Sequence, residues 1–171
     1  MEKYKVDAMQ ALESVSRIND LIISGVPFSD GENLYDYFNA WCKALGYKDN
    51  NLPLVDIRRL SSKRLENGNG AVILIQFAFT VHRNEFFSRY MRTRTLSLKT
   101  IGFTVDKRIY VNENLGPSAR EIRSTSLKMK KEGKLRSVIS KNGVVFVKRF
   151  SDDKEVPVST INDLELLIRK N

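Results

Sequence analysis

Lysine and arginine are concentrated in three groups along this sequence, and these groups are its clearest candidates for binding a ligand. Guanidinium groups donate paired hydrogen bonds to phosphate and stack on bases, and ammonium groups supply point charges. The first group contains Arg58, Arg59, Lys63 and Arg64, the second Arg89, Arg92 and Arg94, and the third Arg120, Arg123, Lys128, Lys130 and Lys131. Each phosphate that such groups neutralise makes binding more sensitive to salt. The pattern therefore predicts a polyanionic partner.

The net charge is unevenly distributed along the chain. The 171 residues carry 29 Lys plus Arg against 20 Asp plus Glu, a formal net charge of +9. Residues 1–18 are balanced, residues 19–53 carry a net charge of −3, and from residue 54 onward 24 bases face 12 acids. A diffuse excess of this size would most often be a solvated face. Its grouping into three clusters favours an electrostatic binding surface instead.

Residues for hydrolytic, nucleophilic or metal chemistry are scarce. A zinc site needs several ligands at defined spacing, but the sequence has one histidine, His82, and one cysteine, Cys42. Asp152 and Asp153 lie in a predicted turn, where Asp is common in any case. Residues 68–70 (GNG) lack the Lys-Ser/Thr of a phosphate loop. We expect no catalytic site, no metal site and no cofactor, so the protein is predicted not to be an enzyme.

The first 18 residues predict a short coiled-coil-like helix. Small or apolar residues recur there at alternating spacings of four and three, namely Tyr4, Ala8, Ala11, Val15 and Ile18. Isolated helices shorter than about 12–15 residues are marginal in water. The segment therefore either packs on its own domain or is the stump of a longer oligomerising stalk, and the sequence leaves both open.

Residues 19–112 predict an α+β domain of the ferredoxin-like type found in RNA-recognition modules. A helix from near Glu32 to Gly46, capped by Ser29 or Asp30, would place Leu34, Phe38, Trp41 and Leu45 in one apolar stripe. Its companions are expected as strands at 20–27, 55–60 and 71–77, a helix at 82–93, and extended pieces at 96–103 and 107–112. The resulting order is βαββαβ.

Residues 113–171 predict a small α/β domain. Pro117 suits the first turn of a helix that ends at Gly133. Residues 141–143 (KNG) are a hairpin turn signal between strands at 135–140 and 144–148. A third strand at 155–158 and a helix at 161–168 complete the domain, which is small enough that we expect it to dock on its neighbour.

Base stacking on the predicted sheet is not favoured. RNA-recognition modules stack bases on aromatic residues of their first and third strands. Here Ile22, Val72 and Leu74 occupy the expected positions, and Tyr110 of the last strand is the aromatic candidate. Arginine contacts to the phosphate backbone are therefore the expected mechanism, with weak sequence preference.

The sequence gives no sign of membrane insertion or secretion. The longest apolar run, near residues 71–75, is far too short to span a bilayer, and no leader precedes it. The single Cys42 cannot form an internal disulfide, which fits a reducing compartment. We expect a soluble intracellular protein without a membrane partner.

Two sets of motifs carry a family resemblance. Residues 21–27 (LIISGVP) and 29–33 (SDGEN) resemble the opening of the RNA-binding module in first-open-reading-frame proteins of LINE-type retrotransposons. The C-terminal domain of the baculovirus few-polyhedra (FP) protein family is similar at residues 109–115 (IYVNENL), 130–133 (KKEG), 141–143 (KNG) and 163–164 (DL). Together these matches cover about residues 19–168, and the C-terminal match is the more specific.

The resemblance implies a nucleic-acid chaperone that binds single-stranded RNA or DNA and coats its own transcript in a ribonucleoprotein particle. It also implies a homotrimer formed by an N-terminal coiled coil, located in cytoplasmic particles or in the nucleus. By motif, Arg92 and Arg123 correspond to family binding residues, and Arg58, Arg59 and Arg64 lie near the family's basic strand and loop. The alternative is a viral or domesticated FP-type protein that acts through protein or nucleocapsid contacts.

Overall fold

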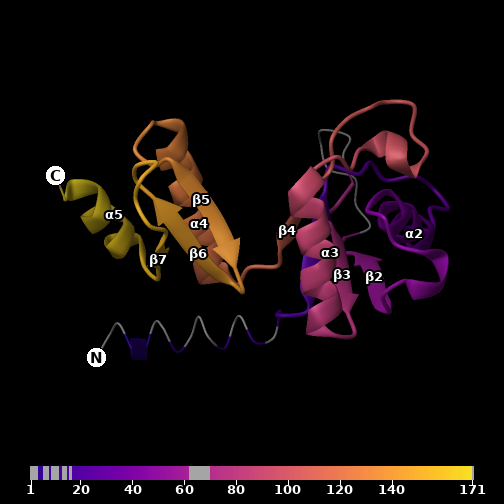
Figure 1. Ribbon diagram of the computed structural model, residues 1–171, viewed down its shortest axis with the longest axis horizontal. Helices are drawn as coiled ribbons and strands as arrows, with labels where there is room; N and C mark the ends of the chain where they lie inside the picture. The colour runs from indigo at the N-terminus through magenta and orange to yellow at the C-terminus, as the bar shows by residue number, and fades with distance from the viewer. Residues whose placement is uncertain are drawn as a thin grey trace. The chain divides into compact units, whose positions relative to one another are not determined.

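The chain folds into two compact units with mixed α+β structure. The computed structural model describes residues 4, 5, 8, 12, 15, 17–61 and 70–170. One unit spans Asn19–Asn112, and the other contains Glu113–Asn171 together with the N-terminal segment Met1–Ile18 (Figure 1). Each unit has its own hydrophobic core and its own antiparallel sheet, so each is described separately below.

The 19–112 unit is built on a four-stranded sheet. Its strands are β1 (Asp20–Ser24), β2 (Val55–Arg59), β3 (Ile73–Phe77) and β4 (Tyr110–Glu113), arranged in the order β2-β3-β1-β4. β3 runs antiparallel to both β1 and β2, with Ile22 opposite Leu74 and Arg58 opposite the same Leu74. Because side chains alternate along a strand, this register decides which residues share a face of the sheet.

Two helices cover one face of this sheet, α2 (Leu34–Ala44) and α3 (Thr80–Thr93). The predicted stripe is confirmed, since Phe38, Trp41 and Leu45 are buried in the core and Leu34 packs against it. The predicted cap was wrong. Asn33, rather than Ser29 or Asp30, caps α2, and its Oδ1 accepts the backbone N–H of Tyr35 at 3.0 Å.

The segment at 96–103, which was predicted to be extended, contains a short 3-10 helix, η2 (Leu98–Ile101). Ser97 and Thr100 close a reciprocal capping box at its start, which satisfies backbone donors that a strand would have to pair. Leu96 and Leu98 are buried, so the apolar residues that suggested a strand fill the core from an irregular segment. One isolated β-bridge, between Ser97 and Arg108, joins this segment to the residues before β4, where Leu98 donates to the carbonyl of Lys107 at 2.8 Å. A second 3-10 turn, η1, covers Asp49–Asn51.

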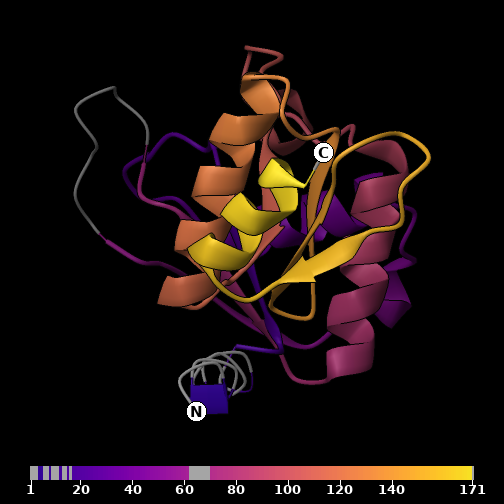
Figure 2. The same cartoon turned by 90° about the vertical axis from the view of Figure 1, so that its left-hand side faces the viewer.

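The C-terminal unit is a three-stranded sheet with two helices. Its elements are α4 (Pro117–Lys131), β5 (Ser137–Lys141), β6 (Val144–Lys148), β7 (Val156–Val158) and α5 (Ile161–Arg169), and the strand order is β5-β6-β7. Ile122 of α4, Val145 and Val147 of β6 and Leu164 of α5 form its core. Figure 2 shows α5 lying beside α4.

The predicted Asn-Gly hairpin is confirmed. Asn142 and Gly143 both have positive φ, at 51° and 81°, as a two-residue hairpin turn requires, and they join β5 to β6. The buried carboxylate of Glu113 accepts the backbone N–H of Asn142 at 2.9 Å and of Gly143 at 3.5 Å. The turn is therefore tied to the residue at which the unit begins.

Within residues 1–18, the described positions 4, 5, 8, 12 and 15 are helical, and Arg17 and Ile18 lie in a turn. Of the predicted apolar seam, Tyr4, Ala8, Val15 and Ile18 are exposed, and Ala11 lies outside the described residues. In the described part of the chain, no helix combines the length and the apolar character needed to cross a membrane.

Candidate nucleic-acid interface

In the sheet of the 19–112 unit, the exposed candidate binding residues lie on the edge strands rather than on the central strands. Ile57 of β2 and Ile75 of β3 belong to the core, so by alternation Arg58 and Leu74 point to the face away from the helices. Arg58 is exposed, but Leu74 is buried. The central position where an RNA-recognition module presents an aromatic ring therefore holds an inaccessible leucine.

Tyr110 is the exposed aromatic residue of β4. Val111, the next residue, is in the core, so Tyr110 lies on the same face of the sheet as Ile22. The guanidinium of Arg108 lies over the Tyr110 ring at 5.2 Å from its centroid. A ring and a cation at the exposed edge form a surface on which a base and a phosphate can both be held.

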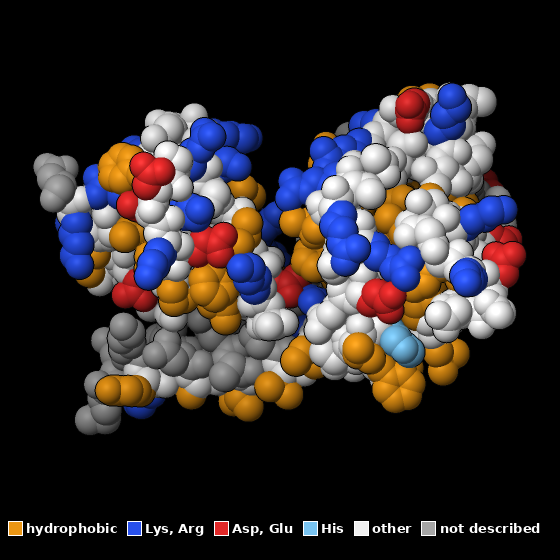
Figure 3. Space-filling view, in the orientation of Figure 1, with side chains coloured by type: hydrophobic (Ala, Val, Ile, Leu, Met, Phe, Trp, Pro, Cys, Tyr) orange, Lys and Arg blue, Asp and Glu red, His pale blue; other side chains and the backbone are white. Residues whose placement is uncertain are grey.

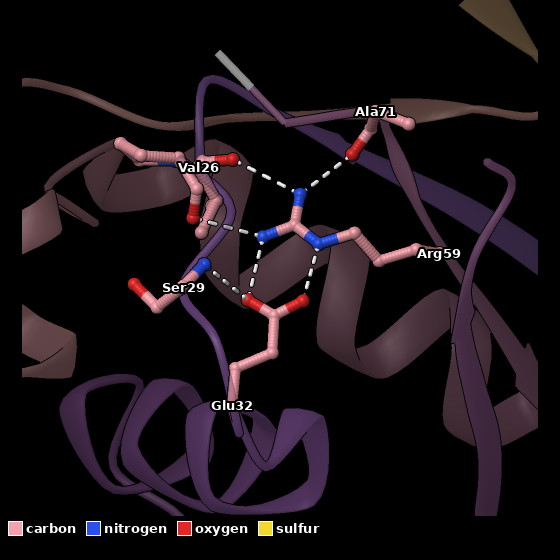
Figure 4. A network of polar contacts seen from close by, with 6 residues as sticks. Val26, Ser29, Glu32, Arg59 and Ala71 are labelled. Carbon is pink, nitrogen blue, oxygen red and sulfur yellow. Dashed lines mark hydrogen bonds and ion pairs between the residues drawn. The ribbon is translucent and has the colours of Figure 1, made fainter. Parts of the chain in front are cut away.

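Arg59, predicted to bind nucleic acid, has a structural role instead. Its Nε and Nη2 donate to the Glu32 carboxylate at 2.6 and 2.9 Å (Figure 4). Nη1 donates to the carbonyl oxygens of Val26 at 3.0 Å and Ala71 at 2.7 Å, and Nη2 to that of Pro27 at 3.0 Å. All five guanidinium donors are used, and the side chain is 7% exposed. No donor remains for phosphate.

Strand alternation could have identified this difference between two adjacent arginines. Val55, Ile57 and Arg59 share one parity in β2, and Val55 and Ile57 contribute to the core or pack against it. Arg58 has the opposite parity and is exposed. The sequence showed the alternation, but it did not show that Glu32 and three carbonyl groups would meet Arg59 on the inner side.

The basic end of α3 divides into fixed and available side chains. Arg89 donates to the carbonyl of Leu45 at 3.1 Å, pairs with Glu85 at 2.8 Å and lies 4.0 Å from the centroid of the Tyr47 ring. Arg92 and Arg94 are exposed. Arg89 therefore joins α3 to the end of α2, and the two later arginines project their charge into solvent.

The α4 cluster is mostly exposed. Arg120 and Lys128, Lys130 and Lys131 lie at the surface, and Arg120 donates to the carbonyl of Leu115 at 3.1 Å. Arg123 is half-buried and already has an interaction within the protein. The three lysines stand in the last turn of the helix, where they also complement the negative end of the helix dipole.

Seven of the predicted basic residues are exposed and have no carboxylate partner among the residues that the structure describes. They are Arg58, Arg92, Arg94, Arg120, Lys128, Lys130 and Lys131. Figure 3 shows lysine and arginine side chains on the visible surface of both units. Lys63 and Arg64 lie outside the described residues. Charge that is not neutralised by a neighbouring acid remains available to a polyanion.

Buried titratable groups of the 19–112 unit are poorly suited to nucleophilic chemistry. Burial raises the pKa of the Cys42 thiol to about 12, although nearby Arg89 opposes the rise. Burial and the negative charge of Glu85 raise the pKa of Tyr47 to about 12, again against Arg89. A cysteine that stays protonated is a weak nucleophile. Within the described ranges, no three His, Cys, Asp or Glu side chains gather as a metal site would require.

The C-terminal unit contains a basic depression, and of the cations that line it only Lys130 was predicted as a binding residue. Its further cations are Arg136, Lys148 and Arg149. The turn at Asn142 and Gly143 fixes a register in which Ser137 faces Lys148. This register brings the basic residues before β5 and at the end of β6 close together, so the hairpin signal in the sequence could have predicted the cluster.

Comparison with known proteins does not place the chain in a family. Neither the comparison with protein families nor that with curated protein sequences finds a match. The resemblance of the motifs at residues 21–33 and 109–115 remains an expectation, and function has to be inferred from charge and geometry.

Proposed function

We propose that this protein binds single-stranded RNA or DNA without enzymatic turnover and with little sequence preference. The observation that carries the proposal is the set of seven exposed, unpaired cations defined above. Four of them are arginine, the residue best suited to phosphate and to base stacking. Cations spread over both units suit a long polyanion better than a small ligand.

We propose that the 19–112 unit is an RNA-recognition-like module of ferredoxin-like topology. The element order β1-α2-β2-β3-α3-β4 and the strand order β2-β3-β1-β4 support it. Its mode of binding would be atypical, because the buried Leu74 replaces a stacking ring. Arg58 and Tyr110 on the edge strands, with Arg92 in the last turn of α3 and Arg94 at its C-cap, would hold the phosphate backbone.

We propose further that the protein coats a retroelement transcript and acts as a chaperone in cytoplasmic ribonucleoprotein particles, or in the nucleus. The FP-like motifs of the C-terminal unit support this through resemblance alone. A homotrimer would cover the exposed N-terminal seam, in which Tyr4 is 80% and Val15 70% exposed. Apolar a and d positions are what a coiled coil buries between chains.

The salt dependence of binding tests the electrostatic part of this proposal. Fluorescence anisotropy of an unstructured oligoribonucleotide should show log affinity falling linearly with log salt, with a slope of about −0.7 per phosphate contact. Seven contacts would give a slope of about −5. Replacing Arg92 and Arg94 together by alanine should make the slope shallower by about 1.4.

The matched control replaces Lys43 and Lys48 by alanine, since these exposed lysines lie in the acidic part of the sequence. We expect a smaller loss of affinity and an unchanged slope. A salt-independent affinity, or equal effects of both double variants, would contradict the proposal. Capture of an acidic protein that oligonucleotides do not displace would instead support the FP-type alternative.

A further inference from the structure

A basic depression lies on the C-terminal unit between the end of α4 and the β5-β6 hairpin. It consists of two adjoining hollows of about 470 and 480 Å³, which share Lys130, Arg136 and Ser151. Lys148 and Arg149 add two further cations, and neither hollow is lined by an acidic residue. Hollows of this volume are in the range of small-ligand sites, and their lining is complementary to an anion.

Three separate segments bring the cations together. Lys130 comes from the last turn of α4, Arg136 precedes β5, and Lys148 ends β6. The backbone N–H of Arg136 donates to the carbonyl of Lys148 at 2.8 Å, which locks the two residues side by side. Like charges held close together repel one another, and a bound anion would remove that repulsion.

Ser137 adds a buried hydroxyl to the basic depression. Ser137 lines the depression, and its Oγ is buried without a hydrogen-bond partner among the described residues. A buried hydroxyl without a partner costs free energy, so such groups usually have a ligand or water to bind. A phosphate oxygen in the depression would accept a hydrogen bond from this hydroxyl.

Phe150 adds an aromatic surface at the same place. Phe150 lines the depression and is 59% exposed, so its ring is open to a stacking partner. The guanidinium of Arg149 lies 5.1 Å from its centroid. Arg149 is itself held at the end of α5, where it donates to the carbonyl oxygens of Leu167 and Lys170.

We propose that the basic depression binds one nucleotide unit of a single strand. Lys130, Arg136, Lys148 and the Ser137 hydroxyl bind its phosphate, and an unpaired base stacks on Phe150. This inference rests on the proposed function, but it assigns the contact to residues outside the seven exposed cations, apart from Lys130. The phosphate is either internal to the strand or a terminal 5′-phosphate.

Removing charge from the depression tests the phosphate site. The double variant Arg136→Gln with Lys148→Gln should lower oligonucleotide affinity about tenfold or more and make the salt slope shallower by about 1.4. The control, Lys154→Gln with Arg169→Gln, removes two exposed charges of the same unit that do not line the depression. Equal losses in the two double variants would overturn the proposal.

Two oligonucleotides, with and without a 5′-phosphate, distinguish the two phosphate sources. If the depression binds an internal phosphate, the Arg136/Lys148 variant should lose the same affinity for both oligonucleotides. If it binds a terminal phosphate, the variant should lose affinity only for the 5′-phosphorylated strand.

Phe150 tests the stacking part separately. Phe150→Ala should weaken binding by roughly 5- to 150-fold, the range for loss of one base–aromatic stack, and Phe150→Trp should retain affinity. Since the side chain is largely exposed, the substitution should leave the fold intact. Unchanged affinity of Phe150→Ala would remove stacking from the proposal.

Failure of the depression and failure of the proposed function give different results. If the wild-type chain binds oligonucleotides with a steep salt dependence but the depression variants match their control, only this inference fails. If the wild-type chain binds no oligonucleotide, the proposed function fails. In that case, titration of the full chain with inorganic phosphate tests whether the depression binds an anion. Shifts of the amide NMR signals of Ser137 and Ser151 would support an anion site. Unchanged signals would overturn it.

Discussion

The guanidinium of Arg59 and the carboxylate of Glu32 form a two-point ion pair inside the 19–112 unit, at 2.6 and 2.9 Å. Both side chains are less than a tenth exposed. The pair joins the end of β2 to the residue before the cap of α2, and the Ser29 backbone N–H donates to the same carboxylate at 3.4 Å. An arginine that the sequence groups with binding residues thus holds the loop after β1 in place.

Replacing Arg59 by alanine should destabilise the protein by about 3–5 kcal/mol, because it leaves a buried carboxylate without its cation. Three carbonyl groups would lose their donor as well. Urea unfolding, followed by circular dichroism, measures this. The control is Arg58→Ala, an exposed neighbour, which should change stability by no more than about 0.5 kcal/mol. Equal costs at the two positions would contradict the structural role.

Gly70 should be coupled energetically to Arg59. A Cβ at this position would lie 2.8 Å from Cζ of Arg59 and 2.9 Å from the backbone nitrogen of Phe28. Gly70→Ala should therefore cost about 1–3 kcal/mol, as overpacking does. The double variant with Arg59→Ala should lose less unfolding free energy than the sum of the two single variants, because the clash with the guanidinium disappears. Strict additivity of the unfolding free energies would contradict this coupling.

Replacing Arg94 by glycine should have opposite effects on stability and on oligonucleotide binding. Arg94 ends α3 in the left-handed conformation, at φ 48°, where glycine is unstrained and a residue with a Cβ is not. Arg94→Gly should raise the free energy of unfolding by up to about 1 kcal/mol and also weaken oligonucleotide binding. Arg92→Gly, inside the helix, should lower stability by about 1 kcal/mol instead. Unfolding and anisotropy measurements on both variants check the opposite signs.

Stability should fall at alkaline pH because of two buried groups. The pKa of Cys42 rises from 9.0 to about 12 and that of Tyr47 from 10.0 to about 12, with burial as the main cause in both. The folded protein therefore holds protons that the unfolded chain releases. The stabilisation is complete below pH 9 and is lost as the pH approaches 12, at up to about 1.4 kcal/mol per pH unit for each group.

The variant Cys42→Ala isolates the thiol contribution. Its unfolding free energy should decline less steeply between pH 9 and 10, where the unfolded tyrosine is still largely protonated. Urea unfolding at a series of pH values provides the measurement. Parallel curves for the wild-type chain and the variant would show that Cys42 makes no contribution.

Local signals in the sequence predicted most elements correctly. The spacing of Phe38, Trp41 and Leu45 predicted the buried face of α2, and Asn142 with Gly143 predicted the turn between β5 and β6. Both signals act within a few residues, through helix periodicity and through the backbone angles that Asn and Gly tolerate. The extended conformation predicted for residues 96–103 was wrong at Leu98–Ile101, because apolar residues there fill the core from a 3-10 helix.

The excess of positive charge, its grouping and the order of the main helices and strands follow from the amino-acid sequence. Which cations remain available to a ligand depends on how the chain folds. Arg58 and Arg59 are the same residue type and adjacent, yet one is exposed and the other donates all its hydrogen bonds inside the protein. The reason is physical. The partners of Arg59 come from residues 26–32 and 71, and only folding brings these segments to one side of β2.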